Sequence, residues 1–143
     1  MKKVLFICVH NSARSQMAEA FLQKYGGGRY EAESAGFEPR GLNPLAVEVM
    51  RESGIDISRK TSQSVFDLFK NGLLYSYVIT VCDGATEKQC PVFPGVVRRL
   101  HWEFPDPAVL TGSYEERLAG TRDIRDLIEA KIKTWLAKMP DKQ

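Results

Sequence analysis

Apolar and polar positions alternate along the chain in a way that predicts four strands separated by helices. Lys3–Val9 is an almost unbroken apolar run of β-forming residues, which is typical of a strand buried on both faces of a parallel sheet. Shorter runs at Tyr30–Ala35 and Tyr77–Val81 predict two more strands, and Val97–Trp102 predicts a weaker fourth. Helices must cover both faces of such a sheet.

Helical spacing predicts the segments that cover this sheet. In Ala13–Tyr25 apolar residues recur every three or four positions, and the three glycines at 26–28 are expected to end the helix. Asn43 is the expected N-cap of a second helix, which begins at Pro44 and ends at Gly54.

Two further helices complete the pattern, a short one at Ser64–Lys70 and a long amphipathic one at Glu115–Lys138. The order of elements predicts an α/β fold with a four-stranded parallel sheet and helices on both faces. No repeat or linker interrupts it, so we expect a single domain over residues 1–143. The residues expected on the apolar side of the last helix are Leu118, Ile124, Leu127, Ile128, Ile132, Trp135 and Leu136.

Composition limits the possible functions. The net charge is only +2 and the basic residues do not cluster, which argues against a nucleic-acid partner. No apolar stretch is long enough to span a membrane, and Val4–Val9 is too short for the apolar region of a signal peptide. We therefore expect a cytoplasmic protein, in which the three cysteines do not form a structural disulfide framework.

The segment Cys8–Ser15, between the first strand and the first helix, carries the candidate chemistry. Backbone N–H groups at such a junction point toward one place, where the helix dipole favours negative charge. Arg14 adds a planar guanidinium that suits a tetrahedral oxyanion. The expected oxyanion-binding residues are Val9, His10, Asn11, Ser12, Ala13, Arg14 and Ser15.

Cys8 is the expected nucleophile, because the field that holds an anion in this loop also favours a thiolate. Ser15 can donate a hydrogen bond to the sulfur, and Asn11 can adopt a positive φ and brace the loop. The alternative is a buried strand-end cysteine with Arg14 on the helix surface. A nucleophile loop directly after the first strand resembles that of the low-molecular-weight protein tyrosine phosphatase superfamily.

Two more cysteines raise a redox hypothesis. Cys82 follows the strand Tyr77–Val81, so Cys8 and Cys82 are both expected on the rim where parallel sheets bind ligands. If the two strands are neighbours, Cys82 could resolve a Cys8 adduct, and Cys90 could then carry the disulfide outward. Alternatively, Cys82 is a small core residue and Cys90 a surface thiol. Zinc fits less well, since the spacing matches no usual ligand pair.

Seven motifs occur in order along the chain, namely Cys8–Ala20, Ser34–Gly36, Leu42–Pro44, Gly54–Ser58, Val81–Cys82, Cys90–Pro91 and His101–Trp102. With these motifs the chain resembles the thioredoxin-coupled arsenate reductases, which share the low-molecular-weight phosphatase fold, a three-layer sandwich. The resemblance extends to about Ala108. It implies that arsenate is reduced to arsenite through a relay of Cys8, Cys82 and Cys90, with thioredoxin as the reductant.

Asp106 is the general acid that the resemblance implies. Pro105 and Pro107 stiffen its segment and keep it out of a helix. A lone Asp-Pro pair is more often a solvated turn, but both related families use such an aspartate to protonate the leaving oxygen. His101 and Trp102 are expected to pack near the site rather than to react.

No metal or organic cofactor is expected. Asn11, Glu19 and Ser34 match positions that line a potassium site in some relatives, but Gln63 stands where those relatives carry an aspartate. Potassium is therefore only a weaker alternative. The spacing between Cys82 and Cys90 is one residue longer than in the familiar forms of the family.

A phosphatase is the rival hypothesis within the same fold. It would form a phosphoenzyme on Cys8, use Asp106 as acid and then base, and need no further cysteine. Ala108–Val109 stands where such phosphatases tend to carry tyrosines, which favours the reductase. An oxyanion-sensing module is a third hypothesis, disfavoured because every expected catalytic residue is present. The expected partners are arsenate, with phosphate or sulfate as mimics, and thioredoxin, acting on a monomer.

Overall fold

A computed structural model describes residues 2–82, 95–96 and 98–139. Its centre is a four-stranded parallel sheet in the order β2-β1-β3-β4. The strands are β1 (Lys2–Cys8), β2 (Tyr30–Gly36), β3 (Tyr77–Thr80) and β4 (Arg98–His101). The predicted parallel sheet is confirmed, and its first strand lies inside it, between β2 and β3.

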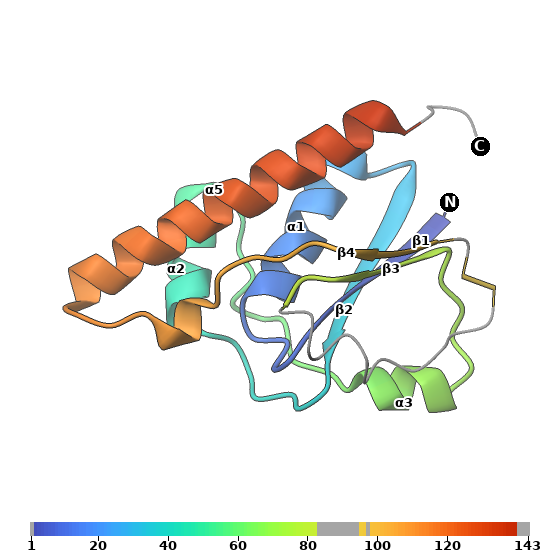
Figure 1. Cartoon of the computed structure of the whole chain (residues 1–143), viewed down its shortest axis with the longest axis horizontal. Coiled ribbons are helices and arrows are strands. Elements are labelled where there is room, and N and C mark those ends of the chain that lie inside the picture. The colour runs from blue at the N-terminus through green and yellow to red at the C-terminus, as the bar shows by residue number, and fades with distance from the viewer. Residues whose placement is uncertain (1, 83–94, 97, 140–143) are drawn as a thin grey trace.

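Helices cover both faces of the sheet (Figure 1). α1 (Arg14–Gly26), α2 (Pro44–Glu52) and α5 (Tyr114–Lys138) lie on one face, and α3 (Val65–Lys70) lies on the other. A short 3-10 helix, η1 (Pro107–Val109), precedes α5. The prediction of a three-layer α/β sandwich is therefore confirmed. Among the described residues, no helix is long and apolar enough to cross a membrane.

Strand β1 explains the continuous apolar run, because its side chains enter two separate hydrophobic clusters. Val4, Phe6 and Cys8 pack into the cluster beneath α1, α2 and α5. Leu5 and Ile7 pack into the cluster beneath α3. Strand side chains alternate between the two faces, so a strand covered on both sides needs apolar residues at every position. The chain leaves this buried strand at Cys8.

The ends of the helices follow the predicted signals closely. Asn43 caps α2 by accepting a hydrogen bond from the Leu45 N–H at 2.9 Å, with Pro44 as the first helical residue. α1 ends at Gly26, and the backbone turns at Gly28 with φ of +93°. Ser113 caps α5 in a capping box with Glu116, so the helix begins at Tyr114, one residue before the predicted start.

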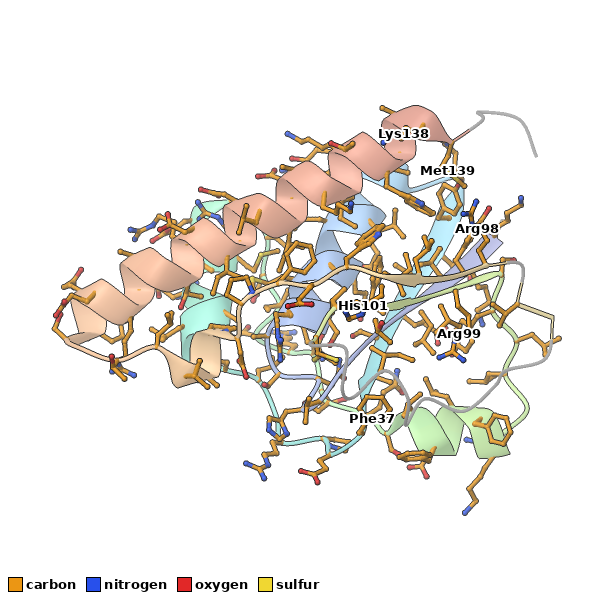
Figure 2. The ribbon with its side chains drawn as sticks, in the orientation of Figure 1. Phe37, Arg98, Arg99, His101, Lys138 and Met139 are labelled. Atoms are coloured by element: carbon orange, nitrogen blue, oxygen red, sulfur yellow. The ribbon has the colours of Figure 1, made fainter. Side chains whose placement is uncertain are left out.

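One prediction was wrong, and another was confirmed in spite of a weak signal. Leu127 was expected on the apolar side of α5 but its side chain is 53% exposed. It lies about 100° around the helix from the fully buried Ile128, beyond the edge of the buried stripe. The fourth strand gave a weak signal because β4 is an edge strand with an exposed start. Figure 2 shows Arg98 near the end of α5 and Arg99 on the other side of the sheet.

Candidate active site

The loop after β1 turns its carbonyl groups outward. Five consecutive carbonyls accept hydrogen bonds of 2.8–3.3 Å from groups outside the loop. In a trans peptide unit the carbonyl and the following N–H point in opposite directions. The N–H groups of residues 9–13 therefore face the inside of the loop, at the N-terminus of α1, which is where an anion is stabilised. The donor and acceptor pairs are Phe37 to Cys8, Glu38 to Val9, Arg40 to His10, Ser62 to Asn11 and Asn43 to Ser12.

Asn11 makes the turn of this loop possible. Its φ is +52°, the left-handed conformation that the sequence predicts, and its side chain is fully buried. Its backbone N–H points at the sulfur of Cys8 over 3.3 Å. The loop thus curls back over the end of β1 and directs a backbone donor at the candidate nucleophile.

The hydroxyl of Ser15 also lies against the sulfur, with Oγ 3.0 Å from Sγ of Cys8. The direction of this hydrogen bond follows from Asn11. Its Oδ1 accepts from the backbone N–H of Gln63 at 3.0 Å, so its Nδ2 must act as donor. Nδ2 donates to Ser15 Oγ at 2.7 Å. Ser15 accepts there, which leaves its own proton for the sulfur, as the sequence analysis expects.

Arg14 is the first residue of α1 and is buried, with 7% of its surface exposed. This excludes the alternative in which Arg14 lies on the helix surface. One guanidinium nitrogen donates to the carbonyl of Phe104 at 3.2 Å, and the other lies 3.5 Å from Oδ2 of Asp106. The segment before α5 therefore holds the guanidinium in place.

Asp106 is anchored by one carboxylate oxygen and turns the other toward Arg14. Its Oδ1 accepts the backbone N–H of Ala108 at 2.9 Å and so caps η1. Its Oδ2 is turned toward Arg14, and the side chain keeps one third of its surface exposed. A carboxyl group held beside an oxyanion-binding guanidinium is suitably placed to protonate a leaving oxygen.

Cys82 lies at the same rim of the sheet as Cys8. It directly follows β3, is fully buried, and its sulfur lies 4.0 Å from the carbonyl oxygen of Ile7, the residue before Cys8. The pairing of Ile7 with Thr80 makes β1 and β3 neighbours, as the redox hypothesis requires. Cys90, the third cysteine of the predicted relay, lies outside the described residues.

The two histidines and Trp102 take supporting positions. The ring of His10 makes a hydrogen bond to the carbonyl of Glu38, outside the loop. His101 lies 2.7 Å from the hydroxyl of Thr80 on the neighbouring strand. Trp102 is buried between Phe6 and the last helix, which confirms the packing role expected for it.

The residues of the predicted potassium site do come together, but their oxygen atoms already accept hydrogen bonds from other side chains. Ser34 Oγ donates to Glu19 Oε1 at 2.6 Å, and the ammonium of Lys60 contacts the other oxygen of Glu19. Gln63 donates its side-chain amide to the carbonyl of Ser34 at 2.9 Å. A cation needs acceptors, so this set suits a potassium ion poorly. In the described part of the chain, no group of three or more His, Cys, Asp or Glu side chains could hold a metal.

Sequence reasoning missed the segment that braces the loop from the side. Ser62 Oγ donates to the carbonyl of Asn11 at 2.8 Å, and Gln16 bridges Asn11 and the carbonyl of Thr61. Residues 60–63 have no helical or strand pattern, and Gln63 acts here through its backbone. Only the folded chain brings this segment to the loop.

A buried thiol in a loop of inward N–H groups, with an arginine and an aspartate beside it, is an arrangement that can bind an oxyanion and attack it with sulfur. Residues 3–143 match the low molecular weight phosphotyrosine protein phosphatase family, and the chain belongs to this family. Within it, the chain is 47% identical to the arsenate reductase of Shouchella clausii over 135 residues, which are 94% of both chains.

Solved structures show the same likeness. An arsenate reductase in the phosphate binding state superposes with a TM-score of 0.78 and 32% identity, over 98% of this chain and all of that one. A thioredoxin-dependent arsenate reductase from Corynebacterium glutamicum gives a TM-score of 0.71 and 32% identity, over 96% of this chain and 61% of that one. The resemblance to arsenate reductases that the sequence motifs indicated is confirmed.

Proposed function

We propose that the chain is an arsenate reductase. Arsenate binds to the inward N–H groups of residues 9–13 and to the guanidinium of Arg14. The Cys8 thiolate attacks arsenic, and Asp106 protonates the hydroxyl that leaves as water. The product is a covalent adduct with a sulfur–arsenic bond, in which arsenic is still in its +5 state.

Cys82 then completes the reduction. Its thiolate attacks the sulfur of Cys8, the sulfur–arsenic bond breaks, and the electron pair stays on arsenic, which leaves as arsenite. Cys90 next attacks Cys82 and frees Cys8 as a thiolate. Thioredoxin reduces the Cys82–Cys90 disulfide with two electrons, so the cycle requires no metal or organic cofactor. The relative from Corynebacterium glutamicum, a thioredoxin-dependent arsenate reductase, supports this choice of reductant.

The observation that carries the proposal is the position of Cys82. A phosphatase needs one cysteine, yet this fold buries a second one at the end of the adjacent strand, next to the peptide that leads into Cys8. Because the Cys82 side chain is fully buried, its sulfur is shielded from reagents in the solvent. Cys82 directly follows β3, the neighbour of the strand that ends at Cys8, and this supports direct attack of its sulfur on that of Cys8.

The relay is tested by turnover with thioredoxin, its reductase and NADPH. We expect Cys90→Ser to complete a single turnover and then stop, and Cys82→Ser to release no arsenite. Mass mapping after reaction with arsenate should find a Cys82–Cys90 disulfide in the parent protein. Undiminished multiple turnover by Cys90→Ser would refute the relay.

Phosphatase activity is the second candidate, because the family and the Cys8, Arg14 and Asp106 geometry suit phosphate esters equally well. Cys8 would form a phosphoenzyme, which water would hydrolyse with Asp106 as base. A double variant, Cys82→Ser with Cys90→Ser, separates the two functions. It should keep any hydrolysis of an aryl phosphate and lose all arsenate reduction.

A further inference from the structure

A continuous series of hydrogen bonds leads from Lys60 to the sulfur of Cys8. The ammonium of Lys60 contacts Glu19, whose other oxygen accepts the hydroxyl of Ser34 at 2.6 Å. Ser34 in turn accepts from Nδ2 of Asn11 at 2.9 Å, and the second proton of this nitrogen goes to Ser15, which lies against Cys8. Lys60 is the only charged donor in this series.

The direction of every bond in the series is determined at Asn11. Because Ser34 accepts from Asn11, its own proton must go to Glu19, which therefore has to be an acceptor. Glu19 also accepts from Gln23 at 3.2 Å and from Lys60, so each of its contacts here is a donor. The arrangement requires an ionised carboxylate at position 19.

Such a carboxylate needs a counter-charge. The side chain of Glu19 is only 13% exposed, and that of Lys60 is 27% exposed. A largely buried carboxylate without a cation is costly, so without Lys60 the Glu19 side chain turns toward solvent. Ser34 then loses the acceptor for its proton. Asn11 cannot turn over to compensate, since the Gln63 N–H holds its Oδ1.

We propose that Lys60 is a positioning residue for the nucleophile. By keeping Glu19 an ionised acceptor, it holds Ser34 and Asn11 in the one arrangement that leaves the Ser15 proton for the sulfur of Cys8. The proposal rests on the assignment of Cys8 as the nucleophile. Lys60 is well placed for this role, because the residues that follow it already brace the loop through Thr61, Ser62 and Gln63.

The test measures Cys8 without any arsenate chemistry. In a Cys82→Ser and Cys90→Ser background, the alkylation of the Cys8 peptide by iodoacetamide at pH 7 is followed by mass spectrometry. We expect Lys60→Met to slow alkylation about tenfold, which is the effect of losing one hydrogen bond to a charged group. Lys60→Arg should restore the rate to within about twofold, since it keeps the charge and the donor.

A double-mutant cycle separates this role from a general loss of structure. Glu19→Gln still offers an oxygen to Ser34 but carries no charge, so it needs no lysine. We therefore expect Lys60→Met to have no further effect in the Glu19→Gln background. If Lys60→Met does not fold, Lys60→Gln replaces it in the same measurements. The matched control is Lys133→Met, which removes an exposed lysine of α5 paired with Glu129 at 3.8 Å, away from the oxyanion loop.

Two results would overturn the proposal: a parental alkylation rate in Lys60→Met, or full additivity of the Lys60 and Glu19 substitutions. The proposed function fails by a different result. If Cys8→Ser still reduced arsenate, Cys8 would not be the nucleophile, whatever the alkylation rates show.

Discussion

Gly36 lies so close to Asn11 that a Cβ atom at position 36 would be 2.8 Å from the Asn11 backbone nitrogen. The same atom would lie 2.8 Å from the carbonyl oxygen of Val9 and 3.0 Å from the carbonyl carbon of His10. All three neighbours are backbone atoms of the oxyanion loop. The end of β2 therefore supports the loop directly, and only a glycine leaves room for it.

Gly36→Ala should displace the loop and abolish most of the activity. Backbone atoms cannot move aside as a flexible side chain can, so overpacking of this kind costs about 1–3 kcal/mol of stability. The displaced N–H groups would no longer converge on an anion. Phosphate affinity by calorimetry and the thermal midpoint measure the two effects.

The control for this substitution is Gly120→Ala in α5. Its Cβ would meet the end of the Leu110 side chain at 2.9 Å, which can move. Alanine is also the better helix former. We expect Gly120→Ala to bind phosphate like the parent, and unchanged binding in Gly36→Ala would refute the importance of this contact.

Ser15→Ala should reduce the reactivity of Cys8. The substitution removes the hydroxyl that donates to the sulfur over 3.0 Å and leaves one proton of Asn11 without an acceptor. A lost hydrogen bond to a charged group corresponds to about 1.5–3 kcal/mol, or more than tenfold in rate. Single-turnover rates with arsenate and alkylation of Cys8 measure this loss. Ser53→Ala, at the far end of α2, is the control and should retain the parental rate.

Asp106→Asn should lower kcat by about 10²–10⁴, the usual contribution of a general acid. Asparagine can still accept the Ala108 N–H that caps η1, so the fold of this segment should persist. Aryl phosphates with good leaving groups need no proton, and their rates should fall much less. An equal loss for good and poor leaving groups would indicate that Asp106 does not supply the proton. Asp123→Asn, on the exposed side of α5, is the control.

The lowered pKa of Glu52 predicts that the protein loses stability in acid. Hydrogen bonds from Arg122, and then from Arg125, hold the pKa of Glu52 at about 2, below its ordinary value of 4.5. A lowered pKa stabilises the fold above the unfolded value, and this contribution is lost as the pH falls through about 2. Glu52→Gln should therefore lower the free energy of unfolding at pH 7 and match the parent near pH 2.

Urea denaturation at several pH values measures this difference. Glu48→Gln on the same helix removes an exposed pair with Arg51, 3.0 Å apart, and should change stability less. A difference between Glu52→Gln and the parent that is the same at pH 7 and pH 2 would contradict the assignment.

Much of the fold was predictable because local chemistry determines it. Lys3–Val9 was identified as a buried strand because both of its faces are apolar, and Asn43 marked the start of α2 because its side chain is a cap. Leu127 was assigned wrongly because a helical repeat shows which residues are apolar, not how wide the covering layer is. The sequence signal for the edge strand β4 was weak because the first half of this strand faces solvent.

The site was only partly predictable for a similar reason. Cys8, Asn11, Arg14 and Ser15 are neighbours in sequence, so their geometry follows from one strand-to-helix junction. Lys60–Gln63 reaches the loop through tertiary contacts from a segment without periodicity. No local pattern encodes such a contact.

The burial of β1 on both faces has a consequence for how the protein unfolds. The strand that ends at Cys8 belongs to both hydrophobic clusters, so neither layer of helices can detach without exposing it. We therefore expect β1 to open only when the whole domain unfolds, and not through a local fluctuation. Amide hydrogen exchange in Val4–Ile7 should then report the global unfolding equilibrium, and inactivation by heat should coincide with melting.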